Sequence, residues 1–216
     1  MAINEQQVQH QQGEIVATNV SLEDYMAHYA AHHCEWVEGT VIKVSPSTYQ
    51  HMKLIYYLYA LLDSYFEHRT VGQVIGQPFV IRLPAVPDRR REPDLMVILN
   101  DNPHELKETY MDGPADIVIE VVSEESVERD HGEKFAEYEK GGVPEYWIVD
   151  PLRNETRFYR MDENGRYRRF TEDNSGHYQT PALPGLNVHV PTLWQETLPG
   201  PTATASAVQA MLTGTD

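Results

Sequence analysis

The chain has a single cysteine, Cys34, among its 216 residues, so no disulfide can form within it. It also lacks a run of ~18 apolar residues that could span a bilayer, and its N-terminus lacks the basic flank and apolar core of a secretory signal. These absences exclude a disulfide-stapled secreted scaffold and a membrane-spanning protein, and they predict a cytoplasmic protein. The 41 % hydrophobic and 10 % aromatic content instead indicates a globular fold.

Positive charge is also scarce, because 17 Lys and Arg stand against 33 Asp and Glu, which gives a formal net charge of −16. This balance opposes long-range attraction to a phosphate backbone, since nucleic-acid binding normally requires Lys and Arg. The basic residues are unevenly distributed, however, so local basic surfaces remain compatible with the sequence. They gather in the run Arg89, Arg90 and Arg91 and in the cluster Arg153, Arg157, Arg160, Arg166, Arg168 and Arg169.

The length suits one α/β domain, because domains commonly contain ~100 to 200 residues. Residues 1–18 are polar and glutamine-rich, and residues 197–216 are rich in Thr, Ala, Pro and Gly. We therefore expect a disordered N-terminal segment over residues 1–18, one domain over residues 19–196, and a weakly ordered tail over residues 197–216.

Apolar periodicity and turn residues predict alternating helices and strands. Helices are expected over residues 21–31, 48–68 and 130–140; the longest repeats apolar residues at steps of three and four. The Asn164-Gly165 pair suits a tight turn between strands at 156–161 and 167–170. Other short, apolar or β-branched runs predict strands at 35–44 (two strands), 74–75, 79–83, 95–99, 117–122 and 145–149.

Two acids occupy unusual positions in the predicted strands. Asp94 stands at the mouth of an apolar run, and Glu120 interrupts another. Burying an ionised carboxylate without a partner is costly, so a positive group should meet Glu120. A divalent cation is one candidate, since Mg²⁺ takes one or two carboxylates together with water and phosphate oxygens. Lys134 is another, and from spacing alone an ordinary structural ion pair is an equal alternative.

Lys134 shares one face of its predicted helix with Asp130 and Tyr138, because the three are spaced by four residues. A lysine on that face could orient a water molecule or balance charge that grows on a phosphoryl group. The alternative is a salt bridge with Asp130 or Glu137, which is the more frequent arrangement for a lysine on a helix.

A longer pattern decides between these interpretations. It comprises residues 112–123 (DGPADIVIEVVS), Arg129-Asp130, Lys134, Tyr138, and residues 142–151 (GVPEYWIVDP). This pattern resembles the Uma-two family of restriction-endonuclease-like proteins. The resemblance extends upstream through Glu92-Pro93-Asp94-Leu95, Gln77-Pro78-Phe79, the segment from Ser45-Pro46 to His51, and the turn from Glu35 to Gly39, and so covers about residues 21 to 170.

The resemblance implies a branch of the PD-(D/E)XK phosphodiesterase superfamily. It implies an α/β fold with a mixed central sheet flanked by helices and an added C-terminal β-hairpin, a Mg²⁺ or Mn²⁺ cofactor, nucleic acid (DNA) as partner, and pairing of two copies as a homodimer. Asp94 and Glu120 match the two acids of the superfamily signature, and the backbone carbonyl of Val121 would assist them as a metal ligand. Val122 occupies the position of the signature lysine, and Lys134 on the following helix fits as its substitute.

His51 and Glu35 match recurring family positions, and either could reach the metal or the substrate, so they join Asp94, Glu120 and Lys134 as candidate catalytic residues. The alternatives are a surface histidine in the first helical turn and a structural role for Glu35. The implied function is that of a metal-dependent endonuclease, in which Asp94 and Glu120 hold Mg²⁺ and Lys134 positions the attacking water. The alternative is a catalytically silent nuclease-fold module that binds protein or DNA, which Val122 at the lysine position and the net charge of −16 favour.

Overall fold

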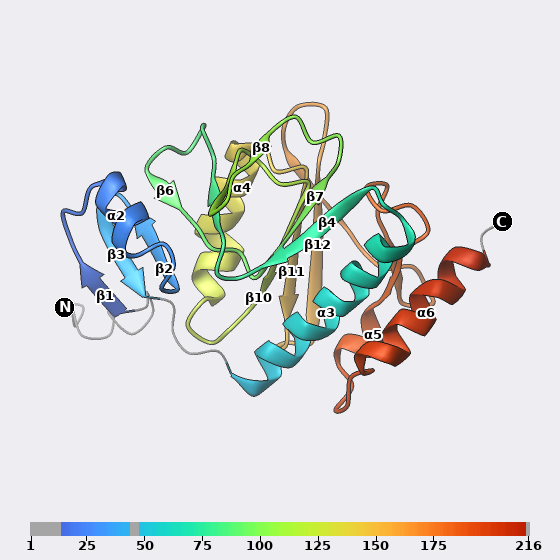
Figure 1. The fold of residues 1–216 in the computed structure, drawn as a ribbon. Coiled ribbons are helices and arrows are strands. Elements are labelled where there is room, and N and C mark those ends of the chain that lie inside the picture. The colour runs from blue at the N-terminus through green and yellow to red at the C-terminus, as the bar shows by residue number, and fades with distance from the viewer. Residues whose placement is uncertain (1–13, 44–47, 215–216) are drawn as a thin grey trace.

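A computed structural model describes residues 14–43 and 48–214 of the chain. The expected break at Ser45-Pro46 and the first thirteen residues of the predicted N-terminal segment lie outside the described residues. The centre of the fold is a six-stranded sheet with the order β13-β12-β11-β10-β7-β4 (Figure 1). Its strands are β4 (Gly72–Gly76), β7 (Leu95–Leu99), β10 (Ile117–Val121), β11 (Glu145–Asp150), β12 (Glu155–Met161) and β13 (Tyr167–Phe170).

The sheet is mixed because β10 and β11 run parallel whereas the other neighbours run antiparallel. This confirms the expected α/β class with a mixed central sheet. Gly165, with φ 71°, supports the turn between β12 and β13, as the sequence predicted. The hairpin is joined to the sheet through β11 and forms its outer edge.

One face of the sheet is covered by helix α3 (Tyr49–His68), and helix α6 (Pro201–Thr213) packs on α3. Thr48 caps α3 by accepting a hydrogen bond from the backbone N–H of His51 at 3.2 Å. The apolar stripe of α3 packs against sheet residues that include Ile117, Ile119 and Val121. Alternate residues of β10 therefore point into the core beneath α3, as the two-residue period of a strand requires.

The opposite face of the sheet carries a π-helical turn, η1 (Arg129–Glu133), that continues into α4 (Lys134–Gly141). Helix α4 ends at Gly142, whose φ of 83° is the left-handed conformation that glycine adopts easily. Val118 and Val122 of the β10 segment pack in the core on this side with Tyr138 of α4. Glu120 belongs to the same alternate set, so it points toward the α4 side as well.

Smaller elements surround this centre. The N-terminal unit combines α2 (Leu22–His28) with a sheet of order β1-β3-β2-β6, formed by β1 (Glu14–Ala17), β2 (Cys34–Val37), β3 (Thr40–Lys43) and β6 (Arg89–Arg90). A three-stranded sheet contains β5 (Val80–Arg82), β8 (Glu105–Leu106) and β9 (Tyr110–Asp112). The chain then adds β14 (His177–Gln179), β15 (Asn187–His189) and the short α5 (Val190–Leu193) before α6.

Both ends of the described chain differ from the sequence-based expectation. Residues 14–17 were expected to be disordered, but they form β1 and pair with β3. Residues 197–216 were expected to be a weakly ordered tail, but they include the thirteen-residue helix α6. Most apolar residues of the helix are alanines, but Val208 and Leu212 lie four residues apart and are buried on the α3 side. Tertiary packing therefore orders a segment with few large apolar side chains of its own.

None of the helices in the described part of the chain combines the length and apolar composition that a bilayer span requires.

Candidate active site

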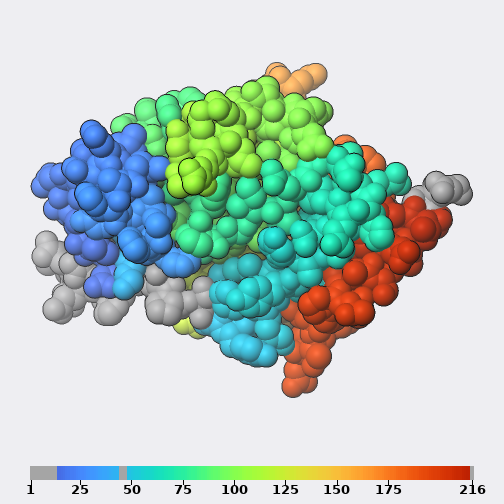
Figure 2. Space-filling view, viewed as in Figure 1, coloured from blue at the N-terminus to red at the C-terminus, as the bar shows by residue number. Residues whose placement is uncertain are grey.

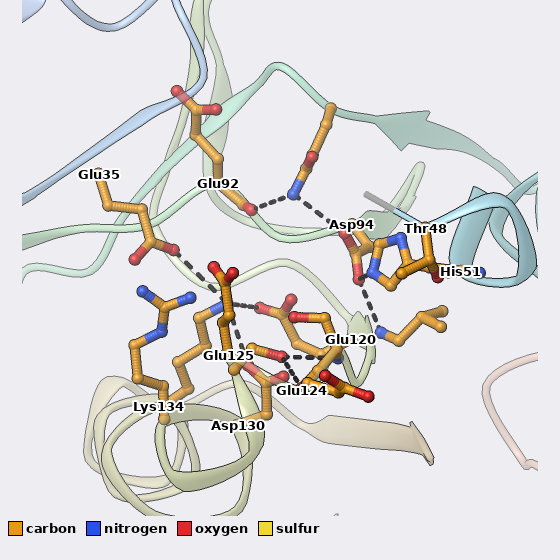
Figure 3. A pocket seen from close by; sticks show the side chains of 15 residues that line it. Glu35, Thr48, His51, Glu92, Asp94, Glu120, Glu124, Glu125, Asp130 and Lys134 are labelled. Carbon is orange, nitrogen blue, oxygen red and sulfur yellow. Dashed lines mark hydrogen bonds and ion pairs between the residues drawn. The ribbon is translucent and has the colours of Figure 1, made fainter. Parts of the chain in front are cut away.

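The register of the central sheet brings the two predicted acids together. β7 and β10 are antiparallel, with Leu95 opposite Ile119 and Met96 opposite Val118. One step further, the same register places Asp94 opposite Glu120. Residues that face each other in an antiparallel pair project from the same side of the sheet, with Cβ atoms about 4.5–5.5 Å apart. Both side chains accordingly line one cavity of ≈ 190 Å³ (Figure 3).

Asp94 is 4 % exposed and is held by three groups. Its Oδ1 accepts a hydrogen bond from the Gln77 side-chain amide at 3.0 Å, and its Oδ2 accepts one from the backbone N–H of Val121 at 2.7 Å. His51 Nε2, from the first turn of α3, lies 3.4 Å from the same Oδ2. Burial would lower the pKa of His51, but the Asp94 carboxylate outweighs it and raises that pKa above its ordinary value. Asp94 is therefore fixed in one orientation.

Glu120 is 2 % exposed and meets α4 through a single oxygen. Its Oε1 accepts a hydrogen bond from the Tyr138 hydroxyl at 2.8 Å and lies 3.0 Å from Lys134 Nζ. Burial, together with the nearby carboxylates of Asp130 and Asp94, raises the pKa of Glu120 to about 8 against the opposing effect of Lys134. Glu120 is therefore held toward α4 by a hydroxyl and an ammonium together.

Lys134 is the positive centre of the cavity. Its Nζ lies 3.0 Å from Glu120, 3.2 Å from Asp130 and 3.5 Å from Glu35 (Figure 3). Burial would lower the pKa of Lys134, but these three carboxylates raise it above its ordinary value. Lys134 forms the salt bridge with Asp130 that its helix spacing allowed. It also reaches Glu120, as expected of a positive group that meets this buried acid. The ammonium is positively charged throughout the neutral range.

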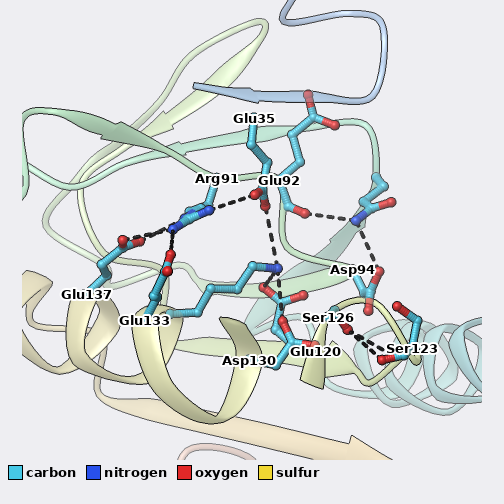
Figure 4. Close-up of polar contacts among 12 residues, drawn as sticks. Glu35, Arg91, Glu92, Asp94, Glu120, Ser123, Ser126, Asp130, Glu133 and Glu137 are labelled. Atoms are coloured by element: carbon cyan, nitrogen blue, oxygen red, sulfur yellow. Dashed lines mark hydrogen bonds and ion pairs between the residues drawn. The ribbon is translucent and has the colours of Figure 1, made fainter. Parts of the chain in front are cut away.

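Glu35 enters the cavity from β2 and is shared by two cations. Arg91 donates to Glu35 Oε2 at 2.7 Å, and Lys134 lies near Oε1. Burial would raise the pKa of Glu35, but Lys134 and Arg91 lower it to about 2. Arg91 in turn donates to Glu137 of α4 at 2.8 Å and 2.9 Å, which ties the N-terminal unit to the helix that carries the lysine (Figure 4).

Glu92 has a different environment from the other acids. It is fully buried, and in Figure 3 its carboxylate points away from Lys134. Neither of its side-chain oxygens makes a well-formed hydrogen bond within the described residues. Burial and the Glu35 carboxylate raise the pKa of Glu92 to about 8, while the Cys34 backbone and Lys134 act in the opposite direction. Glu92 lines the cavity, and its raised pKa favours the protonated carboxyl at neutral pH.

The remaining predicted positions, Val121 and Val122, differ in what they contact. Val122 is buried in the apolar core on the α4 side, the side toward which Glu120 points. Lys134 reaches Glu120 from the helix that covers this side. Val121 lines the cavity and presents backbone atoms to it, including the N–H that binds Asp94.

Several polar residues of this site were not predicted from the sequence. Gln77 and Tyr138 bind the two predicted acids directly, yet they were noted only as parts of a motif or a helix face. Arg91 was assigned to a possible basic surface, but it is 2 % exposed and neutralises Glu35. The burial of an arginine run was not visible in the sequence, because its acidic partners lie 40 or more residues away: Glu35, Glu133 and Glu137.

The arginine cluster around β12 and β13 does not form an unpaired basic surface. Each of its six arginines contacts an acid of the same region: Arg153 with Asp150, Arg157 and Arg169 with Glu155, Arg160 with Glu145, Arg166 with Glu139, and Arg168 with Asp162. Arg160 also lies over the rings of Phe170 and Tyr178. The local charge is therefore largely balanced.

The sequence matches a protein family, and the fold matches a solved structure. A family model described as "Uma2: Putative restriction endonuclease" matches residues 22–191. Among solved structures, the chain is similar to the crystal structure of "a putative nuclease belonging to DUF820" from Anabaena variabilis ATCC 29413. The two are 15 % identical with a TM-score of 0.67, and the match covers 81 % of this chain and 97 % of the other, so it supports the fold. No curated protein matches the chain.

Proposed function

Because the chain belongs to the Uma2 family of restriction-endonuclease-like proteins, we infer that it is a metal-dependent endonuclease that hydrolyses phosphodiester bonds of nucleic acid, with DNA as the expected substrate. The observation that carries this proposal is the convergence of Asp94, Glu120 and Lys134 in one cavity. Two carboxylates from adjacent strands and one buried ammonium are the charges that phosphodiester hydrolysis requires.

The donor set of the cavity fits Mg²⁺ or Mn²⁺. Asp94 and Glu120 offer hard carboxylate oxygens, and the backbone carbonyl of Val121 is a third candidate ligand. No group of three or more His, Cys, Asp or Glu side chains within the described ranges converges as a complete cation cage. This pattern agrees with Mg²⁺, which usually keeps several water ligands and takes few from protein. Bound there, the ion would polarise the phosphoryl oxygens and lower the pKa of a water molecule.

Lys134 would act as a fixed positive charge. Its raised pKa excludes Lys134 as a general base at neutral pH, because the protonated amine cannot accept a further proton. It can instead donate a hydrogen bond to the attacking water or to an oxygen that gains charge in the transition state. Glu35, itself held by Arg91, contacts the ammonium from the side of the N-terminal unit, and His51 holds Asp94.

The competing function is a silent nuclease-fold module that binds protein or DNA. The net charge of −16 and the paired arginines of the β12–β13 hairpin favour it. The placement of Lys134 beside Glu120, in the cavity that Asp94 also lines, favours the enzyme, because phosphodiester hydrolysis uses such charges together.

Titration with Mn²⁺ by isothermal calorimetry separates the two functions. The wild-type protein should bind the ion, and Asp94→Asn should lose that binding, whereas Asp101→Asn at an exposed position should retain it. Plasmid, linear and single-stranded DNA and RNA should then be incubated with Mn²⁺ or with chelator. Cleavage that needs Mn²⁺ and disappears in Asp94→Asn is the expected result. Metal binding without cleavage of any of these substrates would favour the silent module.

A further inference from the structure

Two histidines face each other across the hairpin of β14 and β15. His177 of β14 pairs directly with His189 of β15, and the strands run antiparallel. The next pair in register, Tyr178 and Val188, is buried in the main core. Successive residues of a strand point to opposite faces, so the two imidazoles project together from the outer face of the hairpin. We call His177 and His189 the histidine pair.

The separation of the two rings suits a shared ion. Their centres are 4.7 Å apart, and their planes are inclined at 41°. An ion bound through Nε2 at ~2.1 Å lies about 3.2 Å from the ring centre, so two imidazoles at ~90–109° around one ion have centres about 4.5–5.2 Å apart. The observed separation falls within this interval. The strand register therefore already holds the rings at a distance that chelation requires.

Hydroxyl groups determine which nitrogen of each ring is left for an ion. Ser175 Oγ donates to the Asp173 carboxylate at 2.7 Å and lies 3.0 Å from Nδ1 of His177. A hydroxyl has one proton, so Ser175 accepts from His177 Nδ1–H, and the lone pair of the neutral ring is on Nε2. Thr192 Oγ1 lies 2.7 Å from Nδ1 of His189 and can accept in the same way. Metal-bound histidines typically carry such a contact on their second nitrogen, because it fixes the ring.

We propose that the histidine pair binds a transition-metal dication of the Zn²⁺ type through the two Nε2 atoms. Neutral imidazole suits Zn²⁺, Ni²⁺ and Cu²⁺, whereas Mg²⁺ prefers oxygen ligands. No third His, Cys, Asp or Glu of the described residues completes a cage, so water fills the remaining positions. A pocket of ≈ 260 Å³, lined by His177 together with Asp173 and Gln179, leaves room for that water. The site shares no residue with the cavity of Asp94 and is independent of the proposed function.

An ion at this position would stabilise the C-terminal layer of the fold. β14 and β15 form a sheet of only two strands, and such a hairpin is marginally stable by itself. His189 directly precedes α5, which leads to α6, and α6 packs on α3 along the face visible in Figure 2, red beside cyan to teal. The ion should bind the paired strands more tightly than the unfolded chain, and so it should favour the folded state.

Calorimetric titration with ZnCl₂ tests the proposal on the full chain, purified without a polyhistidine tag. Asp94→Asn serves as the background, because it removes a carboxylate of the proposed Mg²⁺ site. This background should bind Zn²⁺, and adding His177→Gln or His189→Gln should weaken binding at least about tenfold, since losing even a group that orients a ligand costs ~10-fold or more. Ser175→Ala should weaken it as well. His68→Gln, at an exposed histidine that ends α3, is the matched control and should bind unchanged.

Both histidines are partly exposed, so glutamine should be tolerated at either position, and thermal unfolding in chelator checks that the variants fold. The thermal midpoint of the background should rise with Zn²⁺ concentration, and it should stay constant when both histidines are replaced. Equal Zn²⁺ affinity in the background and in both histidine variants would overturn the proposal, and so would an absence of binding up to about 1 mM. Loss of binding in His28→Gln instead would place the ion at α2 and reject the histidine pair. Because the background lacks Asp94, failure of the proposed Mg²⁺ site would leave these results unchanged.

Discussion

Replacing the buried acid Glu92 with glutamine should change how the stability of the fold depends on pH. Burial and the Glu35 carboxylate raise the pKa of Glu92 from 4.5 to about 8. The folded state therefore binds a proton that the unfolded state releases between these values. The contribution of Glu92 to the free energy of unfolding is therefore complete below pH 4.5 and is lost as pH rises through 8.

The size of the effect follows from the same shift. One pKa unit corresponds to about 1.4 kcal/mol, so between pH 6 and pH 8 the free energy of unfolding should fall by roughly 2 kcal/mol through Glu92 alone. Glu92→Gln keeps the shape of the neutral acid but cannot ionise. Its stability relative to the wild type should therefore improve by roughly this amount between pH 6 and pH 8.

Urea denaturation in the presence of chelator, at pH 6, 7 and 8, measures this difference. Glu108→Gln, at an exposed position, controls for the removal of one negative charge from an acidic chain. A constant difference between Glu92→Gln and the wild type across these pH values would refute the argument. It would mean that Glu92 is solvated, or that it is paired in a way that the structure does not contain.

Two further predictions concern the charges around the site. Lys134→Met should lower the free energy of unfolding by about 3 to 5 kcal/mol at neutral pH, because it leaves Glu120, Asp130 and Glu35 without their shared cation. Urea denaturation measures this change. A change below about 1 kcal/mol would show that the ammonium does not stabilise the fold. The double variant Arg168→Ala with Arg169→Ala should change the affinity for single-stranded DNA and its salt dependence by less than about twofold, since both guanidiniums are paired with acids. Weakening by tenfold or more in anisotropy titrations would restore these arginines as phosphate contacts.

The sequence predicted the central elements well because they carry strong local signals. The period of α3 and the apolar run of β10 are long enough to determine their structure, and Asn164-Gly165 marks its turn. The convergence of Asp94 and Glu120 also followed from positions at strand mouths combined with the resemblance. These features depend on neighbouring residues, or on a pattern that a whole family shares.

The parts that sequence analysis missed depend on contacts between distant residues. The order of α6 depends on burial of Val208 and Leu212 beside α3, which its own composition does not reveal. The run from Arg89 to Arg91 looks like a basic surface until Glu35 and Glu137 are placed beside it. A charge pattern read along the chain cannot tell a solvated cation from one neutralised by a partner far away in sequence.

The π-helical turn before α4 has a consequence for how relatives of this protein are aligned. A π-turn holds one residue more than an α-helical turn, and such turns arise where one residue is added within a helix. Gly132 lies in this turn, and a side chain added there would meet nothing within 4 Å. Deleting it would let the turn close as an ordinary α-helix while Lys134 stayed near the cavity. We therefore expect the spacing between Glu120 and Lys134 to tolerate the loss of one residue at this turn.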